Sequence, residues 1–146
     1  MKKLIVMLLL INLNVFGQSH QEQIIDFVNK NKGCKIGTGL CYELVEAAIQ
    51  TFNPSFDGTL SKKNRYGTPV KLSNVMPGDI VFMSGGSKRS INHVAIVYSV
   101  NGDDIYLAEQ NTKGNLRDSK VVVRFLSYST LEDYYGKITY KFYHPS

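Results

Sequence analysis

GTGLCYELVEAA, residues 37–48, joins a flexible loop to the start of an amphipathic helix. Two glycines and a threonine precede Cys41, and from Cys41 onward apolar residues recur at the spacing of one helix face. A cysteine at the first turn of a helix can be a nucleophile, half of a disulfide or a small hydrophobic residue of the core. Residues elsewhere in the sequence are needed to distinguish these three roles.

Helical patterns occupy the first part of the chain and strand patterns the second. Residues 21–33 predict a short helix that ends at the breaker cluster 31–33, and a second helix is expected over about 41–51. Residues 53–78 hold three of the four prolines and predict a long connection with little regular structure. The strand patterns that follow are DIVFM, HVAIVYSV, DIYLAEQ, VVVRFLSY and ITYKFY, and STLEDYYG before the last of them can form one helical turn.

This order of elements predicts the fold class. Two helices followed by a run of strands indicate an α+β domain, in which the N-terminal helices pack on an antiparallel sheet of about five strands. No internal repeat or low-complexity segment suggests a second domain.

The first 17 residues have the pattern of a secretory signal peptide. Two lysines precede an apolar run from Leu4 to about Phe16, which ends at the small residue Gly17. The run is short for a permanent transmembrane helix, the alternative interpretation. We therefore expect cleavage near Gly17, export to the periplasm or the medium, no membrane attachment afterwards, and a single domain over residues 18–146.

The charge of the expected mature chain is mildly positive. Fifteen basic residues remain against twelve acidic ones once Lys2 and Lys3 are removed, a net charge of about +3. This excess is too weak and too scattered to indicate nucleic acid binding. It suits an acidic surface such as a cell wall, and equally suits ordinary solubility.

Two cysteines, Cys34 and Cys41, lie in the expected mature chain. A bridge between them would close a loop of about eight residues and would stabilise the fold by roughly 3 kcal/mol or less. The pair therefore does not predict a disulfide scaffold, although a single bridge stays possible.

The position of Cys41 suits thiol chemistry. Unpaired N–H groups at a helix N-terminus carry partial positive charge, which lowers the pKa of a thiol placed there. The same N–H groups can donate to a developing oxyanion. Taken alone, a cysteine in this position is more often structural than catalytic. A catalytic role for Cys41 therefore also requires a general base elsewhere in the chain.

Among the three histidines, His93 is the best candidate for that base. His20 lies in the polar N-terminal segment, and His144 lies beside Pro145 near the C-terminus. His93 opens a strand directly after the glycine- and serine-rich loop SGGSKRSIN, where it can reach a helix N-terminus from the rim of a sheet. Its alternative role is a hydrogen bond to that loop.

The next strand supplies a group to orient the histidine. In LAEQN, strand alternation puts Leu107, Glu109 and Asn111 on one face. The turn signal NGDD joins the two strands as a hairpin, and counting from it pairs residue 93 near residue 112. Glu109 and Asn111 are therefore both expected within reach of the histidine, where either could fix its tautomer.

Other kinds of site have little support. The cysteine and histidine spacings fit no usual metal site, and the serines lack the context of a nucleophile elbow. The GTG and SGG segments are not phosphate-binding loops. We expect no cofactor and no metal.

The segments GTGLCYELV, MPGDIVFM, HVAIVYSV and LAEQN, in this order, resemble the cysteine, histidine-dependent amidohydrolase/peptidase (CHAP) family, a branch of the papain-like and NlpC-like cysteine hydrolases. The resemblance implies a small papain-like domain with Cys41 as nucleophile, His93 as base and Glu109 as orienting acid. Asn111 is then an alternative or additional polar partner, and Asp79 a structural anchor. Members typically hydrolyse amide bonds of peptidoglycan and need no cofactor for the covalent step.

The sequence therefore predicts an exported cysteine amidase or peptidase that acts on peptidoglycan through an acyl-enzyme. Two alternatives remain: a non-catalytic binding module of the same fold with a Cys34–Cys41 disulfide, and an acyltransferase that uses the same triad. The sequence does not indicate whether a protein inhibitor binds the enzyme.

Overall fold

The computed structural model describes residues 17–58, 66–112, 117 and 119–146. The predicted signal peptide, apart from Gly17, lies outside the described residues. The described helices are α1 (His20–Asn31), α2 (Cys41–Ile49) and α3 (Tyr128–Tyr135), with a short 3-10 helix, η2 (Leu72–Asn74). None of the described helices is both long and apolar enough to cross a bilayer.

Six described strands form one antiparallel sheet in the order β1-β6-β2-β3-β4-β5. The predicted α+β class with an antiparallel sheet is thereby confirmed. The strands are β1 (Thr68–Val70), β2 (Ile80–Gly85), β3 (Ile91–Asn101), β4 (Asp104–Glu109), β5 (Val122–Phe125) and β6 (Ile138–His144).

Two elements differ from the sequence prediction. β1 lies inside the connection expected to be irregular, where it pairs with β6 at the edge of the sheet. Because Pro69 lacks an N–H, this three-residue segment has no strong strand pattern of its own and its pairing depends on β6. The segment expected to form one helical turn is the eight-residue helix α3, capped by the Ser127 side chain.

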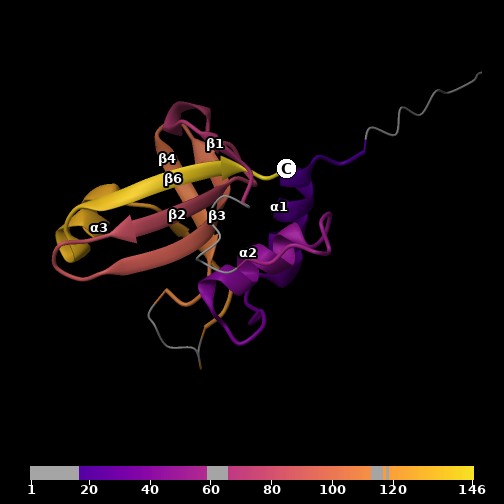
Figure 1. Ribbon diagram of the computed structural model, residues 1–146, viewed down its shortest axis with the longest axis horizontal. Helices are drawn as coiled ribbons and strands as arrows, with labels where there is room; N and C mark the ends of the chain where they lie inside the picture. Colours follow the sequence, from indigo (N-terminus) through magenta and orange to yellow (C-terminus); the bar gives the residue numbers. More distant parts are fainter. Residues whose placement is uncertain (1–16, 59–65, 113–116, 118) are drawn as a thin grey trace, which may run out of the picture.

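The helices cover different parts of the sheet. α1 and α2 lie together on one side of the molecule, whereas α3 lies at the other, near the start of β6 (Figure 1). Alternate residues of the central strands enter two separate cores, with Ile80 and Phe82 packing towards α1 and α2, and Val81 and Met83 in the opposite core. Burial of both faces explains why β2 and β3 are nearly continuous apolar runs.

Asp79 anchors the turn that leads into β2. Its side chain is fully buried, and it accepts hydrogen bonds from the Met76 N–H (2.9 Å) and from Nδ1 of His144 (2.5 Å). Burial raises the pKa of the Asp79 carboxyl, while the Met76 N–H and His144 act in the opposite direction. The preceding Gly78 has φ +91°, and a Cβ there would lie 2.5 Å from the Gln21 backbone of α1. The turn therefore joins the N-terminal helix, β2 and the end of β6.

We predict that Asp79→Ala lowers the free energy of unfolding by about 2–4 kcal/mol, because it leaves the Met76 N–H and His144 without their acceptor in a buried site. Urea unfolding measures the change. Asp26→Ala, on the exposed face of α1, is the matched control and should cost less than about 1 kcal/mol. Equal stability of the two variants would contradict an anchoring role for Asp79.

Candidate active site

Cys41 is the first residue of α2, as the sequence predicts, and its side chain reaches the surface at the wall of a cleft. The residue is only 5% exposed. The sulfur contacts the His93 side chain and accepts from the backbone N–H groups of Val94 and Tyr42. The thiol therefore lies where the N-terminus of α2 meets β3.

His93 lies on β3 between the thiol and a carboxylate. Its Nε2 is 2.8 Å from Oε2 of Glu109 on β4. Because Nε2 is engaged by Glu109, Nδ1 is the ring nitrogen left for Cys41. The imidazole is thus oriented from one side and presented to the thiol from the other.

A bulge in the β3–β4 hairpin decides which residue of β4 shares the face of His93. Asn101 pairs with Asp104 and Ser99 with Tyr106, but beyond Tyr98 the register shifts and Val97 pairs with Leu107. Continuing that register brings residue 93 opposite 111, instead of 112 as counted from the turn. Since paired residues point to the same face, the bulge puts Glu109 on the His93 face and turns Gln110 to the other.

The second carboxylate oxygen of Glu109 is held by Arg124 of β5. Nε and Nη2 of Arg124 lie 2.7 and 2.6 Å from Oε1. Glu109 is 4% exposed, so both of its oxygens are engaged inside the protein. A continuous series of contacts therefore runs from Cys41 through His93 and Glu109 to Arg124.

These contacts outweigh the effect of burial on ionisation. Burial alone would raise the pKa of the Cys41 thiol, but the hydrogen bond and charge of His93 bring that pKa below its usual value. Burial alone would lower the pKa of His93, but Cys41 and Glu109 raise it to about 9. Burial opposes the ionisation of Glu109 as well, yet His93 and Arg124 hold its pKa low. The site favours a thiolate beside an imidazolium.

Asn111 lies in the same cleft, but no hydrogen bond joins it to His93 among the described residues. Its backbone has φ +61°, which ends the extended strand and the alternation on which its predicted position depended. Its N–H donates to Oγ of Ser119 (2.6 Å), and its buried Oδ1 has no partner within the described part of the chain. Of the two predicted partners, Glu109 is the one that contacts the histidine.

Glu43 organises the loop before Cys41. Its Oε2 accepts from the N–H groups of Gly39 (2.9 Å) and Leu40 (2.8 Å) and from Thr38 Oγ1 (3.0 Å). Gly37, at φ +58°, leaves room for this carboxylate, since a Cβ there would lie 2.7 Å from it. A glutamate at the third helical position is a capping signal that the sequence contains.

Gln110 holds the same loop from the sheet. Its fully buried amide donates to the carbonyls of Ile36 (3.0 Å) and Leu40 (2.7 Å) and accepts from the Ile36 N–H (3.2 Å). Ser119 adds a bond to the Gly39 carbonyl (2.8 Å). Strand alternation points to the inward position of Gln110, whereas no local signal indicates Ser119 or Arg124.

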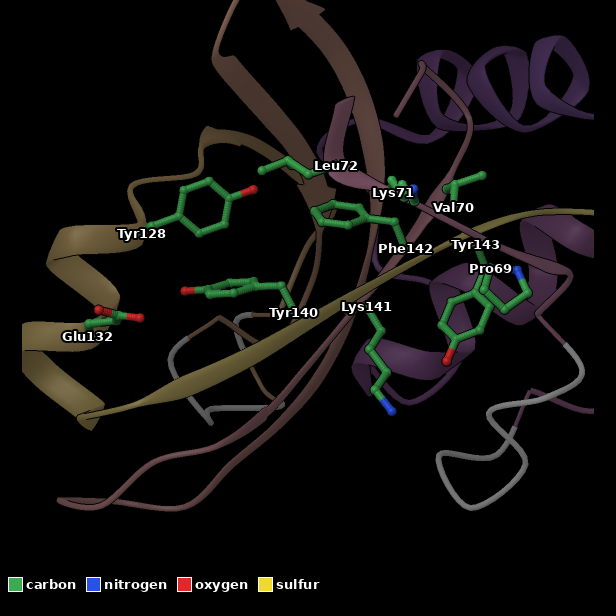
Figure 2. A pocket seen from close by; sticks show the side chains of 10 residues that line it. All are labelled: Pro69, Val70, Lys71, Leu72, Tyr128, Glu132, Tyr140, Lys141, Phe142 and Tyr143. Carbon is green, nitrogen blue, oxygen red and sulfur yellow. The ribbon is translucent and has the colours of Figure 1, made fainter. Parts of the chain in front are cut away.

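The cleft around Cys41 has a volume of about 790 Å³ and is also lined by His93, Glu109 and Asn111. A second hollow of about 850 Å³ lies between β1, β6 and α3. Figure 2 shows its wall of aromatic rings, with Lys141 and Glu132 at its margins. This second hollow contains no cysteine or histidine, so the chemistry identifies the smaller cleft as the candidate site.

The remaining cysteine and histidines lie apart from this cleft. Cys34 is exposed, and neither cysteine is in a disulfide. His20 stacks on Phe52 at 4.0 Å, and His144 binds Asp79. Within the described ranges, no group of three histidine, cysteine or acidic side chains is arranged to hold a metal ion.

Comparison with solved structures shows that the fold is shared. The chain is similar to Ly7917, whose structure contains the hydrolysis product of MDP (20% identity, TM-score 0.59, covering 86% of this chain and 63% of that one). It is also similar to NlpC2 from Trichomonas vaginalis (19%, 0.60, 91% and 49%). A Staphylococcus aureus Mu50 protein described as similar to a lipoprotein of the NLP/P60 family is a third structure with a similar fold (16%, 0.54, 84% and 41%).

The chain thus spans less than two thirds of the length of these structures. A comparison with curated proteins gives no match. The model of the CHAP domain matches residues 28–111, more than half of the chain and a range that includes Cys41, His93 and Glu109. The chain therefore belongs to the CHAP domain family.

Proposed function

We propose that this protein is a cysteine amidase or peptidase that hydrolyses amide bonds of peptidoglycan through an acyl-enzyme. The observation that carries the proposal is the series of contacts from Cys41 through His93 to Glu109 in an open cleft of a CHAP domain. A thiol with a lowered pKa, a histidine and an orienting carboxylate are the groups that acyl transfer through a thiolate needs.

The first half of the reaction forms the acyl-enzyme. His93 takes the Cys41 proton, and the thiolate attacks the amide carbonyl, while N–H groups at the start of α2 stabilise the oxyanion. As the tetrahedral intermediate collapses, the imidazolium gives its proton to the leaving amine. The C–N bond breaks, and the acyl group stays on sulfur as a thioester.

The second half releases the acid. His93, neutral again, removes a proton from a water molecule, whose oxygen attacks the thioester carbonyl. Collapse of the second intermediate expels the thiolate and yields the free carboxylic acid. Glu109 stays ionised throughout, because its role is to orient and stabilise the imidazolium.

The substrate class rests on similarity and on charge. Ly7917, which shares the fold, was solved with the hydrolysis product of MDP, a peptidoglycan fragment. A mildly cationic chain suits an anionic wall. Export belongs to the same proposal, and its support is the charged and apolar pattern of residues 1–17.

Digestion of purified peptidoglycan by the mature protein, analysed by mass spectrometry, tests this proposal. We expect new amines and shortened or released stem peptides. Cys41→Ala and His93→Ala should each reduce turnover by about a thousandfold or more, and the double variant should be no worse than either by more than about tenfold. Normal turnover in Cys41→Ala would refute the mechanism, and products joined to an amine acceptor would indicate a transferase.

The ionisation of the thiol gives a second prediction. Near pH 6, iodoacetamide should modify Cys41 faster than the exposed Cys34, although Cys41 is buried, because the lowered pKa of Cys41 gives it a larger thiolate fraction than an ordinary thiol has. The labelling rate of Cys41 should fall less steeply as the pH falls from 8 to 6 than the rate of an ordinary thiol, which loses about tenfold per pH unit. His93→Ala should restore the ordinary slope. Mass spectrometry of the two peptides measures both rates, and equal slow labelling would contradict the thiolate.

A third prediction separates Glu109 from Asn111. Glu109→Gln keeps an acceptor beside His93 but removes the negative charge that helps to raise its pKa, so the imidazolium loses its proton at lower pH and the alkaline limb of activity should move below pH 9. We expect kcat/KM to fall by on the order of a hundredfold, and by less in Asn111→Ala. Profiles from pH 5 to 9 on one soluble muropeptide measure this. A larger loss in Asn111→Ala would assign the orienting role to Asn111.

A further inference from the structure

Two arginines line the cleft, and its described walls contain only one carboxylate. Arg89 comes from the loop before β3, and Arg124 comes from β5. The carboxylate, Glu109, is buried and is already engaged by His93 and Arg124. When the thiolate and imidazolium neutralise each other, Glu109 balances one arginine and the positive charge of the other remains. The cleft therefore favours an anionic ligand.

Arg124 has N–H donors that its contacts with Glu109 do not use. Both of its contacts to Glu109 converge on one oxygen, Oε1, through Nε and Nη2. Its Nη1 donates to no other group within the described part of the chain, and its side chain is 53% exposed. A guanidinium carries five N–H donors in a fixed plane, so the outer edge of Arg124 can bind a second acceptor.

Arg89 is held in place by α3. Its Nη1 hydrogen-bonds to the hydroxyl of Tyr134, and its guanidinium carbon lies 4.8 Å above the centroid of the same ring. A cation stacked on a ring and fixed by a hydrogen bond loses less side-chain freedom on binding a ligand. The guanidinium of Arg89 is therefore pre-oriented to donate to an acceptor of a ligand. It pairs with no carboxylate in the described structure.

We propose that Arg89 and Arg124 form a subsite for a carboxylate of the substrate, close to the amide that is cleaved. The inference rests on the proposed function. Guanidinium groups match carboxylates in charge and in planar geometry. A carboxylate should therefore bind to them more tightly than a carboxamide of the same shape. The contacts from Arg124 through Glu109 and His93 to Cys41 keep the subsite near the reacting carbon. The preferred substrate is then a peptide with a free carboxylate beside the scissile bond.

The subsite uses a part of the chain that the family match does not include. The CHAP model ends at residue 111, whereas Arg124 and Tyr134 follow it. The reacting groups thus lie within the matched range, and the groups that select the carboxylate lie partly outside it. The proposed preference for acidic substrates therefore depends partly on residues of this chain that lie outside the matched range.

A pair of muropeptides that differ only by a carboxylate or a carboxamide next to the scissile amide tests the inference. The wild-type protein should cleave the acid with a kcat/KM about tenfold higher, mainly through a lower KM. Arg89→Met should reduce this preference to about twofold, and Arg89→Glu should abolish or invert it. Arg89 is the better test position, because Arg124 also holds Glu109.

Lys141→Met is the matched control, since it removes one positive charge from an exposed position on β6 that lines the other hollow. It should leave the preference unchanged. A wild-type protein that cleaves both peptides equally would overturn the subsite while leaving the proposed function intact. Failure to cleave either peptide would count against the proposed function itself.

Binding measured without turnover gives an independent readout. Calorimetric titration of Cys41→Ala with each uncleaved peptide should give an affinity about tenfold higher for the acid, and adding Arg89→Met should remove the difference. Equal affinities of Cys41→Ala for the two peptides would overturn the inference whether or not the wild-type protein hydrolyses them.

Discussion

The candidate site is organised by a buried carboxylate whose two oxygens face different partners. Glu109 binds His93 of β3 with one oxygen and Arg124 of β5 with the other. A buried charge is costly unless it is paired and hydrogen-bonded, so the position requires both partners. His93 and Arg124 together hold the pKa of the Glu109 carboxyl low, and Cys41 and the ionised carboxylate together raise the pKa of His93. Through His93, the protonation state of the Cys41 thiol therefore depends on Glu109, which does not contact the sulfur.

The end of β4 positions both His93 and the start of α2. Glu109 hydrogen-bonds to His93, and its neighbour Gln110 points to the opposite face and donates to the carbonyls of Ile36 and Leu40. Because Leu40 immediately precedes Cys41, the dipeptide Glu109–Gln110 fixes both the His93 ring and the start of α2. A one-residue slip of β4 would exchange these two side chains, and both functions would be lost together.

Local patterns predicted the fold class and the positions of Cys41, His93 and Glu109 in the fold, but not the contacts that fix these side chains. Apolar periodicity and the loop before Cys41 indicated the start of α2, and alternation in the strands indicated a hairpin with His93 and Glu109 at one end. The count from the hairpin turn placed residue 93 near residue 112 but did not include the bulge at Tyr98, which shifts the register by one residue and has no clear signature in the sequence. With a regular register, Gln110 would have shared the face of His93. Asn111 was expected on that face as well, but its positive φ ends the extended strand.

The residues that the sequence did not indicate are far in sequence from the residues that they contact. Arg124 lies 15 positions beyond Glu109, and Ser119 bonds to Gly39 across 80 positions. Neither belongs to a motif, because an arginine or a serine near a strand has many ordinary roles. Both lie beyond residue 111, where the family match ends. The cleft thus has two parts: the segment that the family model matches supplies Cys41, His93 and Glu109, and a C-terminal segment, including β5 and α3, contacts Glu109 and forms one wall. Substitutions in that wall can alter which peptide is bound while the reacting groups keep their arrangement, provided that the contact between Arg124 and Glu109 is preserved.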